Sequence, residues 1–219
     1  DIMIYLQPDD LVHSEALQIR TFLTALFGAD LRTLPPYDLA KQIAAAAIDH
    51  CRRVAPQQPV DAADPAESPI RRIVMARAAS DDELPIFLCA LYRAAGLPAR
   101  VIWGVNVEGA ESGDSQACRQ AWVEFLLPGE KGAAGEWIPV DIVRQRRISP
   151  RAPSAIPVWE WFGNNPSFNQ VIPCAAAPAV PVHRPDMPMQ SLVPQCATCP
   201  ERAPSHEIKV KPSAAPTAQ

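Results

Sequence analysis

The sequence has no apolar run that approaches the roughly 20 residues of a membrane-spanning helix, so we expect no membrane span in this chain. It also has no excess of basic residues, because 20 Lys and Arg are set against 24 Asp and Glu. The formal charge of −4 argues against nucleic acid as a partner, since nucleic-acid-binding proteins concentrate positive charge on one surface. The opening residues, Asp1-Ile2-Met3, do not form a signal peptide.

Cysteine is sparse, and six cysteines at irregular spacing are too few to build a disulfide scaffold. Cys196 and Cys199 form a CxxC pair, a spacing typical of redox centres or of half a zinc site. No second CxxC pair completes four zinc ligands, although His183 or His206 could contribute. We therefore expect no cofactor, and an inert pair or a local disulfide at Cys196 and Cys199. A redox or metal-binding tail is the alternative.

Glycine is scarce and proline is plentiful: 9 glycines are set against 25 prolines, of which 14 lie from Pro150 onward. Hydrophobic residues make up 48% of the chain, which is enough for one sizeable core. We predict an N-terminal helical part over residues 1–60, the core of the domain over 61–174, and a Pro/Ala-rich tail over 175–219. The tail is expected to be extended or disordered, because it cannot bury enough apolar surface to offset chain entropy.

Apolar residues at helical spacing predict two helices in the N-terminal part. The first covers residues 9–28. The second begins after Pro36, and its apolar stripe consists of Leu39, Ile43, Ala47 and Cys51. Between this helix and the next, residues 55–70 lack periodicity and are expected to form a loop.

The third predicted helix has the clearest boundaries. Ser80 and Glu83 form a capping-box pattern, so the helix should begin close to Asp81, and Gly96 should end it. Cys89 lies on the apolar side of this helix and is expected to be a core thiol.

Alternating apolar residues then predict strands over residues 99–107, 121–127 and 137–143, the last two as an antiparallel hairpin. An aromatic cluster is expected to pack a final segment onto the body: Trp159, Trp161, Phe162 and Phe168. The predicted fold class is α+β, with helices packed against an antiparallel sheet.

Three stretches, in this order, resemble the transglutaminase-like superfamily, whose fold is related to that of papain. Residues 91–101 (LYRAAGLPARV) are similar to the family's L-x-R-A-x-G-I-P-A-R-V segment. Residues 120–124 (QAWVE) are similar to its H-A-W-V-E strand, and residues 137–141 (WIPVD) to its W-x-x-x-D strand. The resemblance covers about residues 70–170, including a WFG stretch at 161–163 that is similar to the family's closing Y-F-G element.

The resemblance implies where a catalytic triad would lie. Active members attack with a cysteine at a helix N-terminus, beside a histidine that an aspartate orients. The matching positions here are Asp81 for the cysteine, Gln120 for the histidine and Asp141 for the acid, so only the acid is retained. A carboxylate is a far poorer nucleophile than a thiolate, and an amide cannot accept a proton at ordinary pH.

We therefore predict a pseudoenzyme: a non-catalytic domain that binds a peptide or protein segment, or acts as a structural module. Asp81 is expected to cap its helix, and Gln120 to hydrogen-bond Asp141 or a strand backbone. The candidate groove residues are Trp122, Trp103 and Cys118. By resemblance alone, we expect a bacterial, extracytoplasmic setting, and the chain could be part of a larger or membrane-attached protein.

The alternative is an active hydrolase or acyltransferase with a rebuilt site. Asp81 and Asp141 could act as an acid/base dyad, if burial raised the pKa of one carboxyl. Cys118 could instead act with a distant histidine, for which His50 is one candidate.

Overall fold

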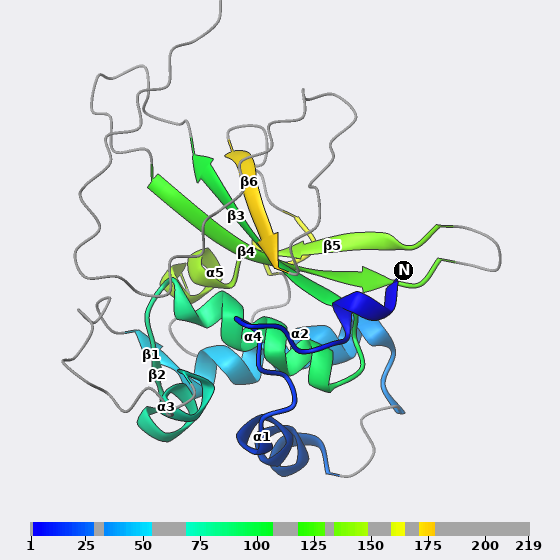
Figure 1. Cartoon of the computed structure of the whole chain (residues 1–219), viewed down its shortest axis with the longest axis vertical. Helices are drawn as coiled ribbons and strands as arrows, with labels where there is room; N and C mark the ends of the chain where they lie inside the picture. The colour runs from blue at the N-terminus through cyan, green and yellow to red at the C-terminus, as the bar shows by residue number, and fades with distance from the viewer. Residues whose placement is uncertain are drawn as a thin grey trace, which may run out of the picture.

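The structure is a computed structural model of the chain, and it describes residues 2–28, 33–53, 69–106, 118–129, 134–148, 159–164 and 171–177. A four-stranded antiparallel sheet forms one layer, and helices packed beneath it form the other (Figure 1). The predicted α+β class is confirmed.

In chain order the described elements are η1 (Ile2–Tyr5), α1 (Leu17–Phe27), α2 (Pro36–His50), β1 (Arg52–Arg53), α3 (Pro69–Ala76), β2 (Ala78–Ala79), α4 (Glu83–Ala94), β3 (Ala99–Asn106), β4 (Cys118–Leu127), β5 (Glu136–Val140), α5 (Ile142–Ile148) and β6 (Val171–Ala177). None of the helices in the described part of the chain is long and apolar enough to cross a bilayer.

The main sheet has the strand order β5-β4-β3-β6, and each neighbouring pair is antiparallel. Strands β3, β4 and β5 overlap the three predicted strands, although β4 begins earlier, at Cys118, and β5 ends earlier, at Val140, and β4 pairs with β5 as the expected hairpin. The predicted boundary between the core and the tail, at residue 174, needs correction. Strand β6 pairs with β3 and runs past that boundary to Ala177. Its alternation is interrupted by Pro173, which is tolerated because β6 is an edge strand among the described strands and has a strand partner on one side only there.

Helix α4 is the centre of the core, because nearly every residue from Leu84 to Arg93 is buried. Its start is the predicted capping box: the Ser80 N–H donates to Glu83 Oε2 at 2.9 Å, and the Glu83 N–H donates to Ser80 Oγ at 3.3 Å. Its end is also as predicted, since Gly96 has a φ of 84°, a left-handed conformation that glycine adopts without strain. The helix is therefore well defined at both ends.

Two helical predictions need correction. The first helix begins at Leu17 rather than near residue 9, because Asp9 forms a turn in which its Oδ1 accepts the N–H groups of Leu11 and Val12 at 2.9 and 2.8 Å. Helix α3 (Pro69–Ala76) was not predicted. Ile70 and Ile73 are buried there, and their spacing of three residues was the available signal.

Helix α5 (Ile142–Ile148) occupies the stretch where we expected the last strand to continue to residue 143. Asp141 ends the strand, because its Oδ1 accepts the backbone N–H of Arg144 at 3.0 Å and its carbonyl accepts the N–H of Gln145 at 3.0 Å. This is the geometry of a helix N-cap. The chain consequently turns from β5 into a helix that lies beside β4 and the start of α4 (Figure 1).

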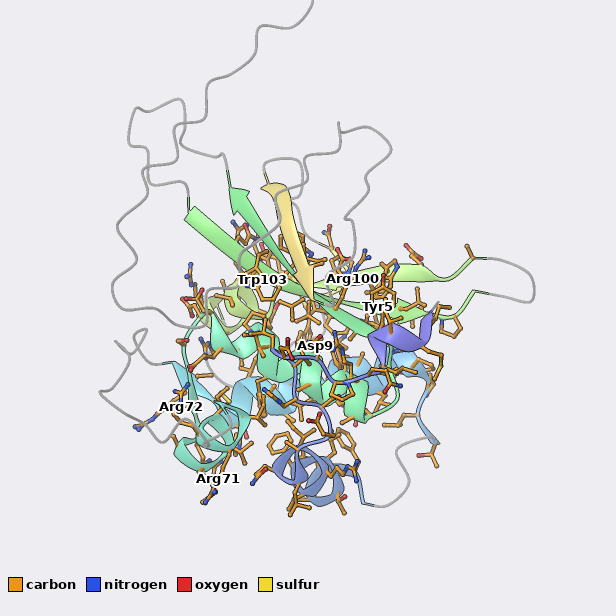
Figure 2. The ribbon with its side chains drawn as sticks, in the orientation of Figure 1. Tyr5, Asp9, Arg71, Arg72, Arg100 and Trp103 are labelled. Atoms are coloured by element: carbon orange, nitrogen blue, oxygen red, sulfur yellow. The ribbon has the colours of Figure 1, made fainter. Side chains whose placement is uncertain are left out.

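The N-terminal segment is fixed to the core by Arg93, whose side chain is fully buried. Its Nε donates to the carbonyl of Ala99 at 2.9 Å, and its Nη1 donates to the carbonyl of Gln7 at 2.8 Å and to Asp9 Oδ2 at 2.7 Å. Asp9 lies over α4 in Figure 2. One guanidinium thus joins the segment before α1, helix α4 and strand β3.

We predict that Asp9→Ala lowers the free energy of unfolding by about 3 kcal/mol, because it leaves the buried Arg93 charge without its carboxylate. Urea denaturation measures the change. The matched control is Asp10→Ala, which alters an exposed neighbour and should change stability by less than about 0.5 kcal/mol. Equal effects of the two substitutions would contradict the role assigned to the pair.

Candidate functional site

Asp81, at the position of the nucleophile, lies between β2 and α4 and is bound by two arginines of α5. Arg146 Nη2 donates to its Oδ1 at 2.8 Å, and Arg147 Nη2 donates to its Oδ2 at 2.7 Å. Each oxygen therefore accepts a charge-assisted hydrogen bond. The side chain is 23% exposed, so this ion-pair cluster lies at the edge of the core.

Arg146 is the most deeply placed member of the cluster, with a side chain only 2% exposed. Its Nη1 donates to the carbonyl of Ala79 in β2 at 2.8 Å, while its Nη2 holds Asp81. In the described residues its Nε has no hydrogen-bond partner. The guanidinium therefore ties α5 to both sides of the turn from which α4 begins.

The expected role of Asp81 as a helix cap needs correction. The capping hydrogen bonds at the start of α4 come from Ser80 and Glu83, whereas the two oxygens of Asp81 accept from Arg146 and Arg147. The aspartate thus joins two elements, and its contribution to stability is tertiary.

Gln120 lies on β4 and makes the hydrogen bond expected of it. Its Nε2 donates to Asp141 Oδ2 at 2.6 Å, and its Oε1 accepts from Arg144 Nη2 at 3.3 Å. Asp141 also lies 3.6 Å from Arg144 Nε. The amide at the place of the imidazole is therefore held between the retained acid and an arginine.

Burial raises the pKa of Asp141, which is 1% exposed. Several contacts oppose this and lower the pKa: the backbone N–H of Arg144, the charge of Arg144, the Gln120 amide and the charge of Arg147. Desolvation is the largest effect, so the carboxyl holds its proton to a higher pH than an exposed aspartate does.

The proposed groove residues do not form one surface. Trp103 pairs with Ala121 and Ile102 pairs with Trp122, so alternation along the strands places the two tryptophans on opposite faces of the sheet. Trp122 is 1% exposed, and its Nε1 donates to Glu124 Oε1 at 3.0 Å. Trp103 is half-buried and packs against the helix-facing core (Figure 2). The two rings therefore cannot line one groove on a single face of the sheet.

The remaining candidates lie partly or wholly beyond the described residues. Cys118 begins β4 opposite Asn106, but its side chain is not among those described. Cys196, Cys199 and the histidines that could join them also lie outside the described part of the chain. Within that part, no group of three or more His, Cys, Asp or Glu residues could hold a metal ion.

The two described thiols of the core are in surroundings that disfavour the nucleophilic thiolate. Cys51 and Cys89 are buried and free, and burial raises the pKa of each thiol to about 12. His50 lies in the helical layer, where its Nε2 donates to the carbonyl of Val74 at 3.0 Å and its ring packs against Phe22. Burial is the main cause that lowers the pKa of this imidazole.

The arginines of α5 were missed as site residues. The sequence shows them as a short basic run, and nothing local connects them to Asp81, which lies 65 residues before Arg146. A signal for α5 itself was present, because an aspartate followed by apolar and basic residues is a helix-start pattern. Recognising Asp141 as a cap would have placed these arginines on a helix beside the site.

Asp81 lies at the start of α4, Gln120 on strand β4 and Asp141 just after β5. This arrangement of the triad positions is that of the papain-like class of fold. The family model described as the transglutaminase-like superfamily matches residues 28–142, just over half of the 219 residues, and the chain belongs to this superfamily. A solved structure described as "a Putative Cysteine Protease from Cytophaga hutchinsonii" is similar, with 18% identity and a TM-score of 0.49. The likeness covers 80% of this chain and 46% of that one, so this chain spans less than half the length of that protein. No curated protein matches the chain.

We predict that Asp81→Asn destabilises the fold by roughly 2 kcal/mol, because it removes the charge that compensates the buried guanidinium of Arg146. The value is below that for a fully buried pair, since water screens the partly exposed carboxylate. Asp82→Asn, at an exposed neighbour, is the control and should have an effect within about 0.5 kcal/mol. Chemical denaturation of both variants decides the matter, and a neutral result for Asp81→Asn would refute the structural role.

Asp141 should make stability depend on pH. Because its pKa is higher in the folded than in the unfolded state, the folded state binds more protons between these two pKa values. The free energy of unfolding therefore falls as the pH rises from about 4, the unfolded value, through the raised pKa. Asp141→Asn removes this contribution, so its stability relative to the wild type should increase over that range. Urea denaturation across the range, with Asp10→Asn as the control, tests this, and parallel profiles would contradict it.

Proposed function

We propose that this transglutaminase-like domain is non-catalytic and acts as a peptide-binding, protein-binding or structural module. The observation that carries the proposal is the pairing of both Asp81 oxygens with Arg146 and Arg147. A group at the nucleophile's position would have to leave these contacts before it could attack a substrate.

The position of the general base supports the same conclusion. Gln120 uses its amide N–H toward Asp141 and its amide oxygen toward Arg144. A neutral amide does not take up a proton at ordinary pH, so this side chain cannot activate a nucleophile as an imidazole does. Asp141 retains the acid of the family, but the partner it orients is no longer a base.

A displaced cysteine does not restore the chemistry at the described thiols. The nucleophile must be a thiolate, and a pKa of about 12 keeps Cys51 and Cys89 almost entirely protonated near neutral pH. Both side chains are also buried, so a peptide carbonyl has no access to their sulfur atoms.

A carboxylate dyad has one observation in its favour, the raised pKa of Asp141, which a general acid would need. The surroundings of the two carboxyls argue against it. Asp81 accepts from Arg146 and Arg147, while Asp141 accepts from Gln120 and the backbone of Arg144. Each oxygen of Asp81 is thus already bound by an arginine, whereas a dyad that shares a proton needs the two carboxyls to contact each other.

Support for a binding role comes from the family to which the chain belongs. Active members hold their substrates over the helix and strands that carry the triad, and this chain keeps that helix, those strands and the acid. We infer that the partner is a peptide or protein segment in an extracytoplasmic setting, as the resemblance implies.

The test uses the purified full chain in assays of peptide hydrolysis and of acyl transfer to an amine, together with cysteine-directed inhibitors. We expect no turnover. We also expect the inhibitors to label no cysteine faster than they label the cysteines of the denatured chain. Asp81→Ala and the neighbouring Asp82→Ala are assayed in parallel. Turnover that is lost in the first variant and kept in the second would show that Asp81 is catalytic and would overturn the proposal.

A further inference from the structure

A second site lies at the end of the helical layer, where α2 ends and the short strands β1 and β2 pair beside α3 (Figure 1). An open pocket of about 430 Å³ occurs there, within the range of roughly 300 to 1,000 Å³ typical of small-molecule sites. It is lined by Ile48, Asp49, His50, Arg52, Ala76 and Arg77. The three triad positions are not among these residues, so the pocket is separate from the Asp81 cluster.

Two arginines supply most of the charge of this pocket. The Arg52 N–H donates to the carbonyl of Arg77 at 3.0 Å, which places the first residue of β1 beside the turn residue that precedes β2. In the described part of the chain, neither guanidinium has a hydrogen-bond or ion-pair partner, and both residues are exposed. The arginines of α5 differ, because their guanidinium groups are bound by Asp81, Gln120 or backbone carbonyls.

The backbone of Arg77 is unusual. Its φ of 51° is the only positive value of a non-glycine residue in the described ranges. This left-handed conformation crowds a Cβ atom against the backbone, whereas glycine adopts it freely. A long charged side chain is thus held in a strained position on the pocket wall, and such strain is concentrated at functional sites.

The other polar groups limit what the pocket can bind. Asp49 opposes the arginines, so the lining has two positive charges and one negative charge when His50 is neutral. His50 donates its Nε2 proton to the carbonyl of Val74, which leaves Nδ1 as an acceptor in the neutral ring. This balance suits one carboxylate better than a doubly charged phosphate, and Asp49 and His50 can accept from N–H or O–H groups of the same ligand.

We propose that this pocket binds a ligand through one carboxylate, which Arg52 and Arg77 hold, while Asp49 and His50 accept from its hydrogen-bond donors. Guanidinium groups match carboxylate geometry with paired hydrogen bonds, so two arginines that line the same pocket suit a carboxylate ligand. The carboxylate can belong to a free small acid or to an acidic peptide, and the proposal does not depend on the fate of the Asp81 site.

The test is a titration of the ¹⁵N-labelled full chain followed by NMR. The probes are N-acetylglycine, its neutral amide, and a blocked pentapeptide that carries one glutamate. We expect saturable shifts of the backbone N–H signals near residues 49–52 and 76–78 with the two acids and none with the amide. A tighter complex with the pentapeptide would identify a protein segment as the source, and a tighter complex with N-acetylglycine would identify a small acid.

Substitutions separate specific binding from general charge effects. Arg52→Gln and Arg77→Gln should each weaken the acid complexes by about tenfold or more, since each removes a charged hydrogen-bond donor. Arg20→Gln, at an exposed arginine of α1, is the matched control and should bind as the wild type does. Arg77→Gly keeps the left-handed backbone and removes the guanidinium, so it should lose binding without a lower melting temperature. Equal shifts with the amide, unchanged binding in the Arg52 and Arg77 variants, or an equal loss in Arg20→Gln would overturn the proposal.

Discussion

The burial of the Arg146 guanidinium is the constraint on which this part of the fold depends. A charge that is 98% removed from solvent is costly unless hydrogen bonds and an opposite charge compensate it, and here the Ala79 carbonyl and Asp81 do so. Because these partners lie on either side of the turn before α4, the position of α5 and the start of α4 are set together. The same contact limits what the site can do chemically, since both oxygens of the carboxylate accept charge-assisted hydrogen bonds and a carboxylate is a poor nucleophile.

The retained acid has a comparable double role. Asp141 caps α5 with one oxygen and accepts from Gln120 with the other, so the carboxylate that orients a histidine in active relatives here holds a helix and an amide. Helix α5 then carries the three arginines that contact Gln120 and Asp81. The replacement of cysteine and histidine is therefore accompanied by two polar clusters that share α5: Asp81 with Arg146 and Arg147, and Gln120 with Asp141 and Arg144. Buried polar groups are costly when they lose a partner, so the removal of one charged or hydrogen-bonding member should destabilise the others of its cluster.

Features with a local cause were predictable from the sequence, and those that depend on contacts distant in the chain were not. The capping box of Ser80 and Glu83 lies within four residues, and it was found at the expected place. The bond between Gln120 and Asp141 followed from the family pattern, which already brings these strands together. The pairing of Asp81 with α5 has no local signal. Trp103 and Trp122 lie on opposite faces of the sheet because each pairs with the residue beside the other in the register of β3 and β4. The sequence does not give this register, so it could not predict the two faces.

The two groups of arginines suggest how the functions of this domain are distributed. In α5 the guanidinium groups are bound within the protein, so their positive charge stabilises tertiary structure and is largely unavailable to a ligand. At the end of α2, Arg52 and Arg77 line a pocket in which Asp49 supplies the one negative charge, and within the described part of the chain neither guanidinium is held in an ion pair. Binding an anion requires charge that is not already neutralised, because a ligand must otherwise compete with an intramolecular partner at high effective concentration. If the domain recognises an acidic group, the pocket at the end of α2 is therefore better suited to it than the position of Asp81, where the arginines are already bound by a carboxylate.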